Sequence, residues 1–278
     1  MASVALASGG RFEIGRVIER TFGVLRRDPL PYLLLGFVLY ALPKLLFFLI
    51  FTARTVSMSA QSLASFNPVA FWSHLGVVAI IFSVVTWVIG LALQPALFSG
   101  MVVGLSGGTP QVSKMLAVGV RLALPVFAIA VITTICFTIG MVLLIVPGII
   151  VGLMLCVAAP VRVAEGPGII RALQRSAELT QGYRWALLGL FAIFIAIFIG
   201  ISLFAGVITI GLTAVTGGLA AMATAGGVGP LQTAMLVVNV IFGTLESLMI
   251  MAAIASAYVE LRGLKDGVGP ETLAAAFD

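Results

Sequence analysis

The sequence predicts an all-α, polytopic integral membrane protein: six transmembrane helices, with short amphipathic interfacial helices on the inner side of the membrane. Charged residues make up only 9% of its 278 residues, against about 25% in a typical soluble domain. The apolar residues come in long blocks, and a helix needs about 20 such residues to cross the hydrocarbon core of a bilayer. Basic residues gather beside these blocks, which is typical of topology signals.

The N-terminal region predicts a short tail followed by a helix on the membrane surface. Residues 1–10 are small and predict a disordered tail. Residues 11–27 place their apolar side chains on one helical face, namely Ile14, Val17, Ile18, Phe22 and Leu25. The other side carries Arg16, Glu19, Arg20, Arg26 and Arg27. A basic amphipathic helix beside a membrane span usually lies in the interface, so we expect this one along the inner surface.

Six apolar segments follow the interfacial helix. We place the spans at about 30–53, 76–104, 122–140, 141–161, 184–212 and 232–260. Together with the interfacial helix they predict a single membrane domain over residues 11–262, and residues 263–278 predict a short polar tail. The connections 105–121 and 162–185 show amphipathic spacing as well, which indicates further interfacial helices.

The block 122–161 is too long for one crossing, because a straight helix of its 40 residues would measure about 60 Å, twice the hydrocarbon thickness. A turn at Pro147-Gly148 leaves a second arm of only about 20 Å. A turn near Thr138–Gly140 gives two arms of about 20 residues each. We therefore expect the turn there, with Pro147 as a kink inside the fourth span. Gly148 and Gly152 are spaced for close helix packing, within one chain rather than between copies.

Topology follows from the positions of the basic residues. The N-terminus, residues 105–121, residues 162–184 and the C-terminus together carry thirteen of them, whereas the opposite connections carry only Arg54. The thirteen are Arg11, Arg16, Arg20, Arg26, Arg27, Lys114, Arg121, Arg162, Arg171, Arg175, Arg184, Arg262 and Lys265. Because positive charge stays on the cytoplasmic side, both termini are expected in the cytosol.

Two ionisable residues lie inside predicted spans, where an unpaired charge is costly. Lys44 and Glu246 each lie 14 residues from the inner end of their span, which is about 21 Å of helix. Equal depth predicts an ion pair. Asn239 lies two turns further out on the face of Glu246. These three residues form either a polar binding site within the membrane or a structural lock between the first and last spans.

A second candidate site is a group of charges on the inner side, formed by Glu165, Arg171, Arg175 and Glu178. Arg171 and Arg175 share a helix face, and Arg175 can reach Glu178 three residues on. Together with Arg26 and Arg27, these two arginines are candidates to contact a lipid phosphate. The alternative is an ordinary solvated inner loop.

Residues that carry catalysis or bind metals are sparse. The single histidine, His74, lies beside Trp72 in an expected outer loop and is typical of an interfacial residue. Cys136 and Cys156 lie inside apolar blocks and are expected to pack as small hydrophobes. The sequence shows neither paired carboxylates nor the nucleophile, zinc or phosphate-loop motifs of enzymes. We therefore expect no catalytic activity and no cofactor.

The stretch 140–185 contains Pro147-Gly148, Pro160, Glu165 and the run RALQRSAELTQGYRW. It resembles a bacterial membrane-domain family that is found fused to glycerophosphoryl diester phosphodiesterases and, more often, as stand-alone proteins of unknown function. The resemblance is close over about 45 residues and loose over most of the chain. It implies a bacterial inner (cytoplasmic) membrane protein. The phosphodiesterase activity of the fused proteins belongs to a separate barrel domain, which this sequence does not contain.

The sequence thus indicates a non-enzymatic integral inner-membrane protein with an accessory role, as an anchor, an assembly partner or a lipid-associated envelope protein. The alternative is a small transporter or channel that uses Lys44, Glu246 and Asn239. A lipid-modifying enzyme has the least support. The expected partners are membrane lipids, anionic ones included, together with a protein partner whose identity the sequence does not give. The basic residues lie beside apolar blocks, so we expect no nucleic acid.

Overall fold

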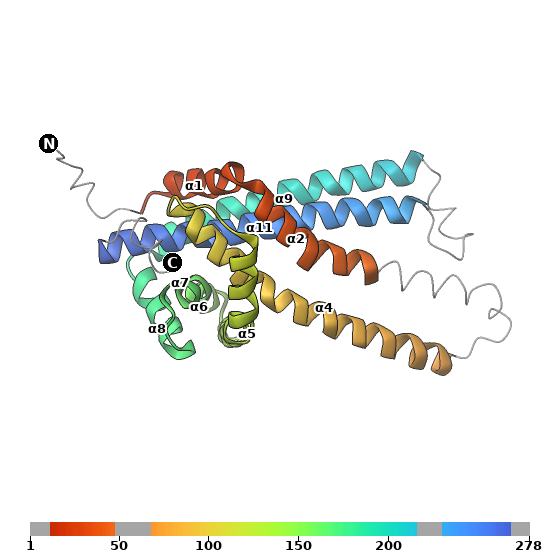
Figure 1. Cartoon of the computed structure of the whole chain (residues 1–278), viewed down its shortest axis with the longest axis horizontal. Coiled ribbons are helices and arrows are strands. Elements are labelled where there is room, and N and C mark those ends of the chain that lie inside the picture. Colours follow the sequence, from red (N-terminus) through yellow and green to blue (C-terminus); the bar gives the residue numbers. More distant parts are fainter. Residues whose placement is uncertain (1–11, 48–67, 216–229, 268–278) are drawn as a thin grey trace. The chain divides into compact units, whose positions relative to one another are not determined.

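The computed structural model describes residues 12–47, 68–215 and 230–267, and these residues form helices without a strand among them (Figure 1). Six helices are long and apolar enough to cross a membrane: Pro29–Phe47, Val88–Leu105, Val112–Leu143, Ile145–Glu165, Arg184–Gly211 and Ala234–Asp266. The predicted fold class is therefore confirmed, and the chain is an all-α, multi-pass membrane protein.

Large apolar side chains cover much of the surface of these helices. Ile80 is 65% exposed, Leu203 is 66% exposed and Val142 is 81% exposed. A water-soluble protein rarely exposes contiguous apolar patches of this kind. In a bilayer the lipid chains cover them, so the exposed faces mark the surface that contacts lipid.

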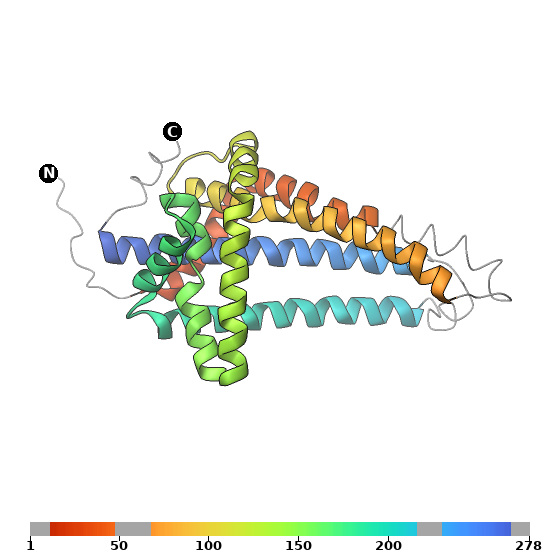
Figure 2. The same ribbon diagram turned by 90° about the horizontal axis from the view of Figure 1, so that it is seen from below.

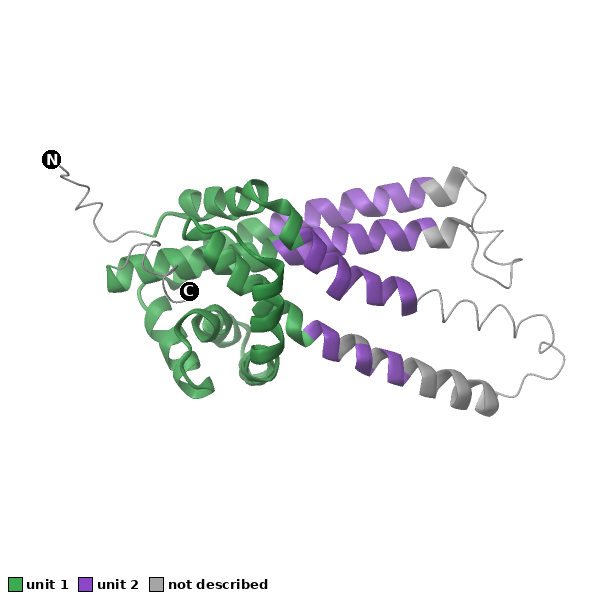
Figure 3. Cartoon of the chain, in the orientation of Figure 1, with its two compact units in different colours: residues 1–32, 91–194, 249–278 green, residues 33–90, 195–248 purple. Residues whose placement is uncertain are grey.

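The chain divides into two compact units, shown in green and purple in Figure 3. Unit 1 comprises residues 1–32, 91–194 and 249–278. Unit 2 comprises residues 33–90 and 195–248. The long helices α4 (Pro68–Leu105), α9 (Arg184–Val215) and α11 (Pro230–Asp266) each contribute residues to both units.

In unit 1, helix α1 (Ile14–Arg27) forms where the amphipathic pattern predicts a helix. Its buried residues are Val17, Thr21 and Val24, which recur at helical spacing. The predicted apolar face is only partly right, because Phe22 is 45% exposed. Only the narrow face of α1 that carries Val17, Thr21 and Val24 packs against the rest of the protein, and the face that carries Phe22 stays exposed.

Helix α2 (Pro29–Gly36) follows α1 after Asp28, whose backbone is not helical. Residues that precede a proline avoid the helical region, which explains the break before Pro29. In unit 2 the helix widens into a π-helix, η1 (Phe37–Ala41). Pro43 lies just beyond it, and a proline lacks an N–H and clashes with the carbonyl four residues earlier. The wider turn accommodates this proline inside a long apolar helix.

Several predictions fall on residues outside those that the structure describes. These are the disordered tail 1–10, the end of the first span with the loop that contains Arg54, the loop 216–229, and residues 268–278 of the polar tail. The first residues of that tail, up to Asp266, continue helix α11. His74, expected in a loop, lies within helix α4.

The turn inside the block 122–161 differs from the prediction, which placed it near Thr138–Gly140. Helix α5 (Val112–Leu143) continues past Gly140, and the chain reverses at Leu144, which has extended backbone angles. Helix α6 (Ile145–Leu155) begins at the next residue, with Pro147 in its first turn. A missing N–H does no harm there, so Pro147 starts the second arm instead of kinking it. The prediction of two equal arms is wrong, because the first arm, α5, has 32 residues. The second arm begins with α6 and continues through α7 (Ala158–Glu165), which gives it 21 residues.

Helices α5 and α6 of unit 1 run side by side (Figure 2), and small residues set their spacing. A Cβ on Gly140 would lie 2.8 Å from the Cα of Gly148, and one on Gly148 would lie 2.6 Å from the backbone nitrogen of Met141. A Cβ on Gly152 would lie 3.0 Å from the ring of Phe137. Gly148 and Gly152 therefore pack within the chain, as predicted.

Helix α8 (Ile169–Thr180) lies between two glycine turns of unit 1. Gly166 and Gly182 have φ angles of 71° and 92°, which side chains disfavour. Gly166 ends α7, and Gly182 follows the end of α8. Ser176 is fully buried and donates a hydrogen bond of 2.7 Å to the carbonyl of Met154, near the end of α6. Such terminal carbonyls have no partner within their own helix, so this hydroxyl fastens α8 to α6.

Candidate functional site

The predicted ion pair between Lys44 and Glu246 of unit 2 is wrong: among the described residues, no ion pair of either side chain is found. Lys44 Nζ donates a hydrogen bond of 2.6 Å to the hydroxyl of Tyr40 and lies 3.9 Å from the centre of its ring. Glu246 Oε1 accepts a hydrogen bond of 3.3 Å from Ser202 of α9. Each charged group therefore bonds to a neutral hydroxyl. Lys44 can reach the hydroxyl of Tyr40 because Tyr40 lies one turn earlier along the chain.

The third residue of this candidate site, Asn239, is exposed on α11. A cavity of about 310 Å³ in unit 2 lies beside these residues without including any of them. It is lined by Leu33, Phe37, Ala41, Leu45, Val237, Val240, Ile241, Thr244 and Leu245. Its one hydroxyl, on Thr244, donates a hydrogen bond of 2.6 Å to the carbonyl of Val240. This cavity is therefore suited to an apolar group rather than to an ion.

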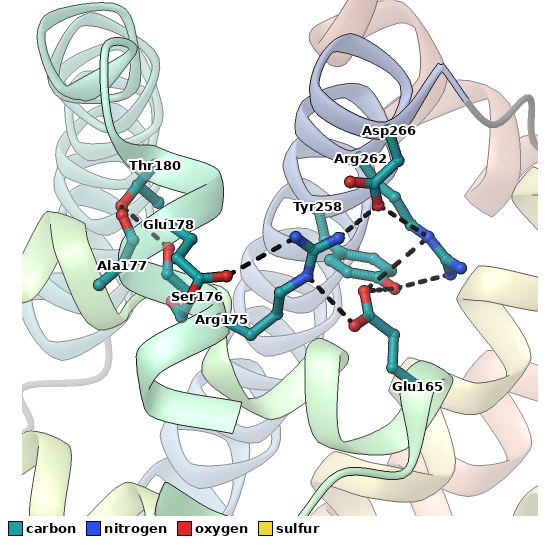
Figure 4. A network of polar contacts seen from close by, with 9 residues as sticks. All are labelled: Glu165, Arg175, Ser176, Ala177, Glu178, Thr180, Tyr258, Arg262 and Asp266. Carbon is teal, nitrogen blue, oxygen red and sulfur yellow. Dashed lines mark hydrogen bonds and ion pairs between the residues drawn. The ribbon is translucent and has the colours of Figure 1, made fainter. Parts of the chain in front are cut away.

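In unit 1, the carboxylate of Glu165 lies at the centre of a polar network (Figure 4). Its Oε1 accepts a hydrogen bond of 3.0 Å from the hydroxyl of Tyr258 and lies 3.8 Å from Nε of Arg262. Its Oε2 accepts a hydrogen bond of 3.3 Å from Nε of Arg175. Arg175 also pairs through Nη2 with Asp266. The network thus joins α7, α8 and the end of α11.

The sequence predicted part of this network, namely Glu165, Arg175 and Glu178. Nη1 of Arg175 lies 3.8 Å from Glu178, at the predicted spacing. Arg171 is exposed, and no contact places it in the network. Three carboxylates surround the guanidinium of Arg175, so its predicted contact with a lipid phosphate would have to displace existing ion pairs.

The charge on Arg175 is stabilised by these contacts. The pKa of its guanidinium is raised above its ordinary value, mainly because it donates a hydrogen bond to Asp266, with Glu165 as a further cause. Partial burial acts in the opposite direction. A group with a raised pKa stabilises the fold at every pH below its ordinary value, so this contribution persists across the physiological range.

The most buried carboxylate in the described ion pairs is Glu260, which the sequence analysis did not single out. Its side chain is only 3% exposed. Oε1 accepts a hydrogen bond of 3.0 Å from Arg16, and Oε2 accepts one of 2.7 Å from Arg20. The two arginines therefore clamp one carboxylate and fasten α1 to the end of α11 within unit 1.

A sequence signal for this contact did exist. Arg16 and Arg20 are four residues apart and so share a helix face. Glu260 directly follows the long apolar stretch of α11, close to the C-terminal end of that helix. The bond from Arg16 nevertheless joins residues 244 positions apart, and no local pattern predicts a partner at that separation.

The other two predicted phosphate contacts lie at the end of α1. Nη2 of Arg27 donates a hydrogen bond of 3.2 Å to the carbonyl of Gly107, and its Nε lies 3.7 Å from Asp28. Arg26 is exposed. The four predicted arginines therefore do not converge on one position through any contact that the structure shows among its described residues.

The described residues contain no group of three or more His, Cys, Asp or Glu side chains placed to hold a metal ion. The ion-pair networks of unit 1 neutralise charge and join helices. No family model matches the chain, and searches of curated proteins and of solved structures find no match.

Proposed function

We propose that this protein is a non-enzymatic accessory protein of the bacterial inner membrane, in which the ion-paired helix ends of unit 1 form a preassembled platform on the cytoplasmic side that anchors or assembles another envelope component. The observation that carries the proposal is the pairing of charges in unit 1. Glu260 is held by two arginines, and Glu165, Arg175, Arg262 and Asp266 form one network.

Paired charges favour a rigid platform over a transporter that changes conformation. A proton or ion pathway needs groups that change partner or protonation state during each cycle. The carboxylate of Glu260 instead makes two charge-assisted hydrogen bonds while almost fully buried. Such contacts hold helices in one arrangement, which is what a docking surface requires.

The charge distribution supports a cytoplasmic position for the ion-paired helix ends of unit 1. Arg16, Arg20, Arg175 and Arg262 belong to the thirteen basic residues that topology rules assign to the cytosol. The resemblance to the membrane domain fused to phosphodiesterases adds support, since a domain of that kind accompanies an enzyme without being one. Membrane lipids and a protein partner are the expected associates.

The rival function, a small transporter built on Lys44 and Glu246, has weaker support. Both side chains bond to neutral hydroxyls, and the neighbouring cavity has an apolar lining. Liposomes that contain the purified protein should show no ion or solute flux above empty liposomes. Flux that disappears in Lys44→Met would replace the platform proposal with this one.

The platform proposal is tested by affinity purification of the tagged full-length chain from bacterial membranes in mild detergent, followed by mass spectrometry. We expect one envelope protein to co-purify at a fixed ratio. The variant Glu165→Gln removes the charge at the centre of the network and should reduce that ratio. The matched control is Glu19→Gln, because Glu19 is exposed on α1 and takes part in none of the described ion pairs.

Both variants must elute from gel filtration as the wild type does, so that a loss of partner is not a loss of fold. Equal retention of the partner by the wild type and Glu165→Gln would show that unit 1 is not the platform. The orientation is tested separately in a chain without Cys136 and Cys156. A cysteine at Gln174, exposed on α8, should react only from the cytosol. One at Ser62, outside the described residues, should react from the other side.

A further inference from the structure

A cavity in unit 1, separate from the cavity described in unit 2, is not used by the proposed function. It has a volume of about 480 Å³ and lies between the end of α4, the loop 106–111 and the first turns of α5. This volume is within the range of pockets that hold small organic ligands, about 300–1,000 Å³.

The shape of this cavity is fixed by close packing. Gly107, with a φ angle of 85°, turns the chain at the end of α4. A Cβ on Gly108 would lie 2.8 Å from the side chain of Val103, and one on Gly100 would collide with Met115. Arg27 of α1 bonds to the carbonyl of Gly107 and holds the loop from outside. The cavity is therefore a preformed feature of unit 1.

Its lining has an apolar and a polar part. Val103, Met115 and Val118 supply the apolar wall, and Met115 is only 2% exposed. The polar part consists mainly of the exposed side chains Thr109, Gln111 and Lys114. A ligand that satisfies both parts must combine a polar head with an apolar body.

The charge of the head follows from the sequence around the cavity. Lys114 is the charged residue of the lining. The sequence has no Asp or Glu between Asp28 and Glu165, so the segment that builds the cavity has no carboxylate to neutralise this lysine. A lysine ammonium binds a phosphate as a point charge. The complementary ligand is thus an anionic, phosphate-bearing amphiphile.

We propose that this cavity binds the head group of an anionic phospholipid. The phosphate binds the ammonium of Lys114 and accepts hydrogen bonds from the Thr109 hydroxyl and the Gln111 amide. The glycerol and the first acyl carbons lie against Val103 and Val118. The segment belongs to the inner connections, where anionic lipids provide such head groups. This inference shares the cytoplasmic orientation with the platform proposal and is otherwise independent of it.

The test is native mass spectrometry of the full-length protein in detergent, titrated with phosphatidylglycerol or with phosphatidylcholine of the same acyl chains. We expect the wild type to retain phosphatidylglycerol preferentially. Lys114→Gln should weaken its binding about fivefold, the loss expected for one basic residue near an anionic lipid. Ala117→Leu, which fills the cavity from an exposed position in its lining, should weaken both lipids.

The matched control is Arg121→Gln, which removes an exposed basic residue from the same helix outside the cavity lining. It lies about 10 Å further along the helix, roughly one Debye length, and should change binding less than about twofold. Equal losses in Lys114→Gln and Arg121→Gln would overturn the proposal, because the attraction would then be general. Inorganic phosphate at millimolar concentration should leave the lipid bound. Displacement by phosphate alone would identify a small phosphate compound as the ligand and would overturn the lipid assignment.

Discussion

The two units of this chain handle charge in different ways. In unit 1 the buried carboxylate of Glu260 takes two arginines, and Glu165 takes two more. In unit 2 the charged side chains Lys44 and Glu246 bond to the neutral hydroxyls of Tyr40 and Ser202. Ion pairs between distant segments hold unit 1 together, whereas the two charged side chains described in unit 2 bond to a hydroxyl on the same helix or on one neighbouring helix.

The glycines of the α5–α6 hairpin in unit 1 and those of α9 in unit 2 also differ. In unit 1 an added Cβ on Gly140 or Gly148 would collide with backbone atoms. In unit 2 an added Cβ on Gly200 or Gly206 would meet nothing within 4 Å. The α5–α6 hairpin of unit 1 therefore depends on exact packing, and the described glycines of α9 in unit 2 face open space that lipid can fill. Four predictions test this contrast.

The largest effect is expected from Glu260→Gln, which leaves Arg16 and Arg20 without their shared carboxylate. The free energy of unfolding should fall by about 2–3 kcal/mol. The loss stays below that of a fully buried pair because the arginine side chains are 37% and 32% exposed. The measurement is an SDS titration in mixed micelles. Glu19→Gln, an exposed site on α1, is the control, and an equal loss there would remove the special role of Glu260.

The next effect is expected from Gly148→Ala, because the new methyl group would lie 2.6 Å from the backbone nitrogen of Met141. The same titration should show a loss of about 2 kcal/mol, as in other overpacked sites. Gly200→Ala is the control in unit 2, and it should leave stability unchanged or raise it by less than about 1 kcal/mol. Similar results at both sites would mean that the two units pack alike.

Arg175→Lys should cost about 1 kcal/mol, since a lysine cannot reproduce the planar fork that reaches Glu165 and Asp266 together. Arg171→Lys, one turn earlier and exposed, should cost almost nothing. The pKa of Arg175 is raised above its ordinary value by the hydrogen bond to Asp266. Its stabilisation is therefore lost only above that value, and the difference from Arg175→Lys should stay constant between about pH 7 and about pH 9. A difference that shrinks over this range would contradict the assignment.

The smallest effect is the coupling between Lys44 and Glu246. Because no ion pair joins them among the described residues, the losses in Lys44→Met and Glu246→Gln should add within about 0.5 kcal/mol in the double variant. A double-mutant cycle in detergent measures this sum. A coupling above about 1 kcal/mol would restore the ion pair and weaken the contrast between the units.

The membrane fold was predictable because a bilayer imposes one length and one polarity on every crossing helix. The turn of the α5–α6 hairpin was not, because the prediction required two straight arms of equal length. A helix can continue through Gly140, and Pro147 is harmless in a first turn, so the chain reverses at Leu144. Hydrophobicity is equal on both sides of this point and carries no information about the position of the turn.

The candidate sites were predictable only where the contacts are local. Arg175 and Glu178 lie three residues apart on one helix, and their contact was expected. Arg175 and Asp266, or Arg16 and Glu260, meet through the fold alone. The predicted pair of Lys44 and Glu246 rested on equal depth, which does not fix the rotation of each helix about its own axis. Lys44 therefore bonds to Tyr40, and Glu246 bonds to Ser202, in place of the predicted ion pair.

The turn at Leu144 has a consequence for biogenesis. Residues 141–147 are all apolar. The turn supplies bonds of its own, from the N–H of Leu144 to the carbonyl of Gly140 and from the N–H of Gly148 to the carbonyl of Leu144. Pro147 has no N–H to satisfy, so in the first turn of α6 only the N–H groups of Ile145 and Val146 need a partner from outside the helix. The hairpin enters and leaves on one side, and thus adds an even number of crossings at any depth. A defect in its insertion shifts the depth of its tip while every later segment keeps its side of the membrane.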